Sequence, residues 1–186
     1  SRLVDEFQYQ SDPYPTTLDF LRILREEAGP EHERIIHDFF ERIMIFDLSI
    51  DTGTAERREL EDGRWETVFT VNARLYEADG EGNETEEPID YDIDVGLFMR
   101  SPDTVNEGTD HILYFERHRI NQAETTLSII TDEEPAWVGI DPYNKLIDRN
   151  SDDNIIQPPR ASDDTDDEET GAAEGEEAET ASLITE

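Results

Sequence analysis

The stretch from Ile89 to Phe98 alternates apolar residues with aspartates over most of its length. Successive side chains of a β-strand point to opposite faces, so the pattern predicts a strand with one apolar and one acidic face. The apolar set is Ile89, Tyr91, Ile93, Val95 and Leu97. On the other face Asp90, Asp92 and Asp94 repel one another and need water, counter-ions or a basic neighbouring strand. We therefore expect a half-solvated antiparallel sheet.

The same alternation recurs elsewhere in the chain. Residues 46–50 and 65–75 each place apolar side chains on one face, and a strong turn signal, Asp62-Gly63, precedes the second run. Residues 54–60, 111–120 and 125–131 are also strand-like, whereas residues 78–87 and 100–110 are expected to be loops. This spacing predicts a mainly β fold, an Ig-like antiparallel β-sandwich of about seven strands.

Two helices are expected before the sandwich. Thr16 can cap the first, with Asp19 three residues later, and Gly29 suits its exit. Apolar residues then recur at three- and four-residue spacing between residues 35 and 43, so the two helices should form an antiparallel hairpin. We divide the chain into a flexible N-terminus (1–12), the helical hairpin (13–45), the β-sandwich domain (46–157) and a disordered acidic tail (158–186). The tail is expected to be disordered because it cannot bury enough apolar surface to offset the entropy lost on ordering.

The charge of the chain is extreme, with a formal net charge of −34 and Lys145 as its one lysine. Such a charge opposes folding through self-repulsion, and molar salt screens it, so we interpret the protein as halophilic. Nucleic acid and anionic membrane surfaces are poor partners because the negative charge of the chain repels them. The chain has no cysteine and no apolar run near the ~20 residues that span a bilayer. We expect a soluble domain that does not insert into a membrane and is monomeric in isolation.

The segment HERIIH, which contains His32, Glu33 and His37, resembles the zinc-peptidase motif HExxH. Its histidines are five residues apart, which is a rotation of about 500° and leaves the second about 140° from the first on a helix. Zinc ligands of that motif share one helix face, so the spacing is wrong. We expect two surface histidines.

Two acidic groups are weak candidates for a cation site. The first is the loop with Asp79, Glu81, Asn83 and Glu84, which could hold Ca²⁺ but lacks the EF-hand pattern. A solvated hairpin tip explains these residues equally, and we favour it. The second is the ladder of Asp90, Asp92 and Asp94, for which a solvated face is favoured.

The most distinctive cluster lies between residues 141 and 154. It could serve acid–base chemistry if a pocket and a nucleophile were near. The alternative, which we favour, is a closing segment in which Arg149 pairs with carboxylates while Tyr143 and Leu146 plug one end of the sandwich. The cluster consists of Asp141, Tyr143, Asp148, Arg149, Asp152, Asp153 and Asn154.

Four patches of the chain together resemble a known family. They are PYPTTLDF (13–20), YEADGEGNETEEPI (76–89), IDVG (93–96) and GIDPYNKLIDRNSDDN (139–154). They are similar to the C-terminal end of bacterial proteins that fuse an ABC-transporter permease to a zinc metallopeptidase domain of the aminopeptidase N type, a gluzincin. The resemblance covers about residues 13–154.

The resemblance implies a larger parent protein with membrane segments and a zinc peptidase-like domain upstream. That family's HExxH motif has no match in this chain, so no catalytic or metal residue is assigned here and zinc is expected only in the upstream domain. The chain would be a non-catalytic accessory domain that packs against the peptidase domain, positions substrate or docks a partner. The resemblance leaves the side of the membrane open, and we favour the extracytoplasmic side. The alternative, from the residues alone, is a free-standing Ca²⁺-dependent binding or adhesion module.

Overall fold

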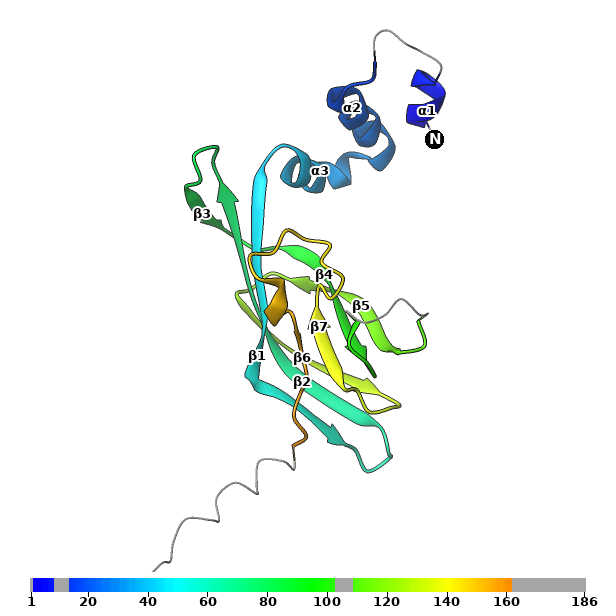
Figure 1. The fold of residues 1–186 in the computed structure, drawn as a ribbon, viewed down its shortest axis with the longest axis vertical. Coiled ribbons are helices and arrows are strands. Elements are labelled where there is room, and N and C mark those ends of the chain that lie inside the picture. Colours follow the sequence, from blue (N-terminus) through cyan, green and yellow to red (C-terminus); the bar gives the residue numbers. More distant parts are fainter. Residues whose placement is uncertain (1, 9–13, 103–108, 162–186) are drawn as a thin grey trace, which may run out of the picture.

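The computed structural model describes residues 2–8, 14–102 and 109–161. In this part of the chain two antiparallel sheets face one another, and a group of helices lies at one end of them (Figure 1). The apolar core lies between the sheets. The mainly β sandwich with preceding helices is therefore confirmed.

The first sheet is built on one long hairpin of β1 (Ile43–Glu59) and β2 (Trp65–Ala78). β2 has β1 along one edge, and along the other it pairs with β3 (Glu84–Glu87) and β6 (Glu124–Thr131). The predicted turn at Asp62-Gly63 joins β1 to β2, and Gly63 has the positive φ of 80° that this turn needs.

The second sheet has the order β5-β4-β7-β8. Its strands are β4 (Tyr91–Phe98), β5 (Ile112–Ile120), β7 (Trp137–Ile140) and β8 (Ile155–Ile156). The alternation that predicted β4 holds for its apolar face, because Tyr91, Ile93, Val95 and Leu97 are all buried. They meet Phe46, Leu48, Phe69 and Val71 of the first sheet in one core cluster.

The helical group begins with α1 (Arg2–Phe7) and continues with α2 (Thr17–Ala28), the 3₁₀ turn η1 (Pro30–His32) and α3 (Glu33–Phe40). Thr16 and Asp19 form the predicted capping box, since the side chain of each accepts from the main-chain N–H of the other. Gly29 ends α2 at a φ of 84°. The helices pack through Phe20 and Phe40, whose ring centroids are 5.7 Å apart.

Several predicted boundaries differ from the structure. β1 begins at Ile43, inside the predicted hairpin, and runs unbroken through residues 54–59, with a register shift between Asp51 and Glu56 instead of a separate strand. Residues 84–87, predicted as loop, form β3 because β2 extends far enough to pair with them. These errors share one cause, since strand length here is decided by pairing with β2 and not by local pattern.

Parts of the two segments predicted to be flexible or disordered have a defined structure. Residues 2–7, predicted as flexible, form α1, and Arg2 pairs there with Glu26 and Glu27. Residues 158–161, predicted as part of the tail, run beside β1, where Arg57 donates to Pro159 O at 2.8 Å. The remainder of both predicted segments, residues 1, 9–12 and 162–186, lies outside the described residues.

Candidate functional site

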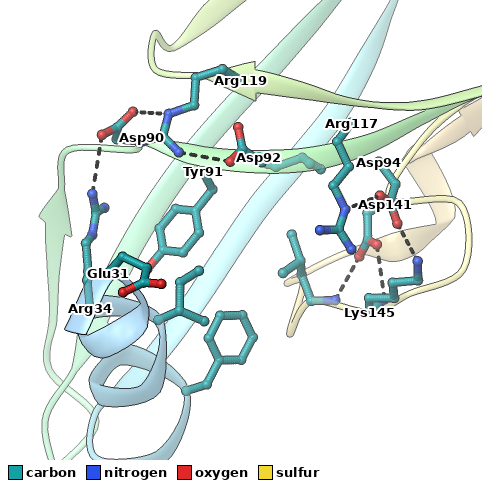
Figure 2. Close-up of a pocket in the computed structure, with 14 residues that line it drawn as sticks. Glu31, Arg34, Asp90, Tyr91, Asp92, Asp94, Arg117, Arg119, Asp141 and Lys145 are labelled. Atoms are coloured by element: carbon teal, nitrogen blue, oxygen red, sulfur yellow. Dashed lines mark hydrogen bonds and ion pairs between the residues drawn. The ribbon is translucent and has the colours of Figure 1, made fainter. Parts of the chain in front are cut away.

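A cavity of about 400 Å³ lies between α3, strands β4 and β5, and the segment 141–146 (Figure 2). It is lined by four of the chain's 15 basic residues and five of its 49 acidic ones, so charge there is nearly balanced. The basic residues are Arg34, Arg117, Arg119 and Lys145, and the acidic ones are Glu31, Asp90, Asp92, Asp94 and Asp141. Apolar and aromatic side chains from α3, β4 and residue 146 complete the lining.

The acidic ladder of β4 is neutralised by arginines of the neighbouring strand. In the β4–β5 register Asp92 lies opposite Arg119 and Asp94 opposite Arg117. Arg119 Nε donates to Asp90 Oδ1 at 2.6 Å and Nη1 donates to Asp92 Oδ2 at 3.3 Å. The hydrogen bond from Arg119 lowers the pKa of Asp90. From the sequence, water, counter-ions or a basic neighbouring strand could offset the repulsion between these carboxylates. The structure contains the basic neighbouring strand.

The prediction of a solvated face is wrong for Asp94, which is buried. Its carboxylate accepts from Arg117 Nε at 3.1 Å and from Lys145 Nζ, and its main-chain oxygen accepts from Asp141 N at 2.8 Å. Burial raises its pKa, but the hydrogen bonds from Lys145 and Arg117 outweigh burial and the net direction is down. Asp94 is therefore held ionised between Arg117 and Lys145 (Figure 2).

A second buried carboxylate, Asp38, anchors α3 to both sheets. It accepts hydrogen bonds from Tyr91 of β4 and from Arg42 Nη1 at 3.0 Å, and Arg42 Nε also donates to Glu77 of β2 at 2.8 Å. Burial opposes ionisation of Asp38, but these donors outweigh it and lower its pKa. Burial, and then the bond to Asp38, raise the pKa of Tyr91 to about 12. The orientation of the helices on the sandwich thus depends on a few polar contacts.

Tyr91→Phe is expected to lower the free energy of unfolding by about 1–2 kcal/mol, because it removes a hydrogen bond to a buried charge. Urea unfolding followed by tryptophan fluorescence measures the change. Tyr143→Phe is the matched control, since Tyr143 is half exposed and its expected change is under about 0.5 kcal/mol. Equal effects of the two substitutions would contradict the anchoring role of Tyr91.

Asp141, from the predicted cluster, is buried and organises the turn that follows it. Its Oδ1 accepts from Lys145 N at 3.1 Å and its Oδ2 from Leu146 N at 2.9 Å. The residue has a φ of 43°, a left-handed conformation that aspartate tolerates better than most residues. Burial raises its pKa, against the two backbone hydrogen bonds. These contacts describe a structural turn that holds Lys145 toward Asp94.

Residues 147–154, the second half of the cluster, contact β1. Phe46 N donates to Ile147 O and Arg149 N donates to Phe46 O, each at 2.8 Å. Asn154, fully buried, donates from Nδ2 to Asp148 Oδ2 at 2.7 Å. These contacts attach residues 147–149 to β1, and the role of the cluster as a closing segment stays a prediction.

The side chains of the predicted cluster do not converge on one point. Arg149 lies over the Tyr76 ring at 4.6 Å and pairs with Glu84. Tyr143 instead packs on Phe115, with ring centroids 5.4 Å apart. The other two belong to η3 (Ser151–Asp153): Asp152 is exposed, while Asp153 is half-buried, accepts from Asn150 Nδ2 at 2.8 Å, and has a pKa raised by burial.

The weak calcium candidate, residues 79–84, is a hairpin tip. The carboxylate of Asp79 accepts from Glu81 N at 2.8 Å, Asn83 N at 2.9 Å and Asn83 Nδ2 at 2.8 Å. Glu84 points to Arg149. The oxygens of Asp79 are thus already used by the turn, as in an Asx turn.

The predicted histidines lie at the helices. The ring of His32 is bonded through Nδ1 to Ala28 O at 2.7 Å, and His37 lies 3.8 Å from Glu41. Among residues 2–8, 14–102 and 109–161, no group of three or more histidine, cysteine, aspartate or glutamate side chains is arranged to hold a metal ion.

No protein-family model, no curated protein and no solved structure matches this chain. The class that the described residues define is an antiparallel β-sandwich with a helical pair docked at one end and a charged cavity at the junction. No helix in that part of the chain is long and apolar enough to cross a membrane.

Sequence reasoning missed the four basic residues that line the cavity, Arg34, Arg117, Arg119 and Lys145, and the anchor Asp38. A signal was present for two of them. Arg117 and Arg119 have the same i, i+2 spacing as Asp92 and Asp94, so one antiparallel register brings all four together. Arg34 and Asp38 have the i, i+4 spacing of an ion pair on a helix, but their place at the cavity, like that of Lys145, depends on the tertiary fold.

Proposed function

We propose that this chain is a non-catalytic accessory β-domain of a membrane-associated zinc aminopeptidase-like protein, and that its helix pair docks on the peptidase domain of the same protein. The parentage comes from the resemblance of residues 13–20, 76–89, 93–96 and 139–154 to that family. The docking role comes from one structural observation, which is the exposed apolar face of the helices.

Part of the apolar surface of α2 and α3 is exposed to solvent, although Leu21, Ile23 and Ile36 are buried. Leu18 is 75% exposed, and Ile35, Phe39 and Phe40 are each between 42% and 49% exposed. Ile35 and Phe39 also line the cavity, so the apolar face and the cavity form one continuous surface. Exposed apolar surface of this kind marks interaction sites in soluble proteins.

Charge favours the same location for docking. Two strongly acidic bodies repel one another over most of their surfaces. At the cavity the acidic and basic side chains nearly balance, whereas over the whole chain acids outnumber bases by more than three to one. An acidic partner from the same cell therefore meets the least repulsion at this end of the sandwich.

Hydrogen exchange in the intact parent protein tests the docking. Amides of α3 are expected to exchange at least tenfold more slowly in the parent than in this 186-residue chain, because the partner covers them. Leu18→Glu in the parent should remove that protection, since it places a charge in the covered face. Ile130→Glu, at a similarly exposed apolar residue on β6, is the control and should leave it intact.

Two results would overturn the proposal. One is equal exchange of α3 in the parent and in the isolated chain. The other is a coding sequence upstream of Ser1 that contains no HExxH motif, since the resemblance requires a zinc peptidase-like domain there.

A further inference from the structure

Two cations at the mouth of the cavity share one carboxylate. Arg117 from β5 and Lys145 from the 141–146 turn both bind Asp94, which is buried beneath them. Arg117 uses only Nε, and its two terminal nitrogens bind no other residue of the described chain. Its side chain is 71% exposed and that of Lys145 is 52% exposed. Unused donors on both cations therefore face solvent at one place.

The other acid nearby does not consume these donors. The oxygens of Asp141 accept from the main-chain N–H groups of Lys145 and Leu146 (Figure 2). A carboxylate that arrives from solvent could accept from the terminal nitrogens of Arg117 and from Lys145 Nζ together. Charge-assisted bonds of this kind are about twice as strong as neutral ones.

Apolar side chains lie beside the cation pair in the same cavity. Ile35 and Phe39 are one helical turn apart on α3, and Leu146 follows Lys145 directly. The Phe115 ring lies 5.5 Å from Lys145 Nζ and supports its position. At about 400 Å³ the cavity is within the size range of pockets that bind small ligands and side chains.

We propose that this cavity binds a protein segment in which an aliphatic side chain adjoins an aspartate or glutamate. The carboxylate of the segment bridges Arg117 and Lys145, and the aliphatic side chain packs between α3 and Leu146. This inference names the chemistry of the partner at the docking surface and so rests on the proposed function. The unused donors of Arg117 and Lys145 favour a carboxylate as the occupant, and the apolar lining adds the requirement for a neighbouring aliphatic residue.

The test titrates this chain, labelled with ¹⁵N, with three capped octapeptides at one salt concentration. The first is acetyl-Ser-Gly-Leu-Asp-Leu-Gly-Ser-Gly-amide, the second has Asn for Asp, and the third has Gly for both Leu. The first is expected to bind at least tenfold more tightly than the others, with saturable amide shifts in residues 117–119 and 141–146. These comparisons on the unchanged protein separate the carboxylate contribution from the aliphatic one.

A variant locates the carboxylate contact. Arg117→Gln leaves Lys145 to pair with Asp94, so the fold is expected to persist, and binding of the first peptide should weaken at least fivefold. Binding of the Asn peptide should not change. Arg58→Gln, which alters an exposed arginine paired with Glu66 elsewhere on the sandwich, is the matched control.

The inference is overturned if the Asp and Asn peptides bind equally, if shifts gather outside the cavity, or if no saturable shift occurs. Its failure is distinguishable from failure of the proposed function. If α3 is protected in the parent but the peptides do not bind, the docking role is supported and the proposed acidic–aliphatic partner is wrong. If the peptide binds but α3 is not protected in the parent, the cavity binds such a segment of another protein and the proposed function is wrong.

Discussion

Asp141→Ala is expected to lower the free energy of unfolding by about 3–5 kcal/mol, the largest single-residue effect we foresee. The substitution leaves the half-buried main-chain N–H groups of Lys145 and Leu146 without their acceptors, each at a cost in the lower part of the typical range of about 1–3 kcal/mol. Alanine also tolerates the left-handed φ of 43° less well than aspartate, which adds about 1 kcal/mol. Chemical denaturation at neutral pH measures the loss.

Asp141→Asn and Asp152→Ala are the matched comparisons. Asparagine accepts a left-handed φ and keeps one acceptor oxygen, so its cost should be well below that of alanine. Asp152 is exposed in the same segment, and its change should be within about 0.5 kcal/mol. If alanine at 141 costs no more than alanine at 152, the organising role of Asp141 is wrong.

The dependence on pH separates the charge of Asp141 from its hydrogen bonds. Burial raises its pKa in the folded state, so the folded protein binds this proton more tightly than the unfolded chain. Its contribution to stability is then fully present below the unfolded value of about 4 and is lost as pH rises through the higher folded value. Relative to Asp141→Asn, the unchanged protein should therefore lose stability as pH rises above about 4.

Thermal stability is expected to rise steeply with salt. Between 0.1 and 2 M KCl we expect the midpoint of unfolding to increase by roughly 10–20 °C, which corresponds to about 3–5 kcal/mol for a domain of this size. The formal charge of −34 opposes the compact state, and the screening length falls from about 10 Å at 0.1 M to about 3 Å at 1 M. Circular dichroism during heating measures the midpoint.

A charge variant distinguishes screening from a general effect of solutes. Glu124, Asp132 and Glu133 are exposed, and none of them makes a salt bridge among the described residues. Changing all three to the corresponding amides should raise the midpoint at 0.1 M KCl and reduce its dependence on salt. Sucrose at equal osmolality should not reproduce the KCl effect. A midpoint independent of KCl would contradict the halophilic interpretation.

What the sequence by itself determined is local. The alternation in residues 89–97 and 65–75 placed the buried face of β4 and β2, the capping box at Thr16 and Asp19 began α2, and Asp62-Gly63 turned the longest hairpin. Each depends on residues a few positions apart, for which backbone geometry and side-chain chemistry are sufficient.

Only the tertiary structure determined which charged side chains are buried. Asp94 is buried although it alternates with Asp92, which is exposed, because Lys145, 51 positions later, covers it. Asp38 is buried because Tyr91 and Arg42 enclose it. Strand register, the docking of α3 and the path of residues 141–149 bring these groups together. Such long-range pairings carry no local periodicity, so the cavity could be recognised only once the sheets and helices were in place.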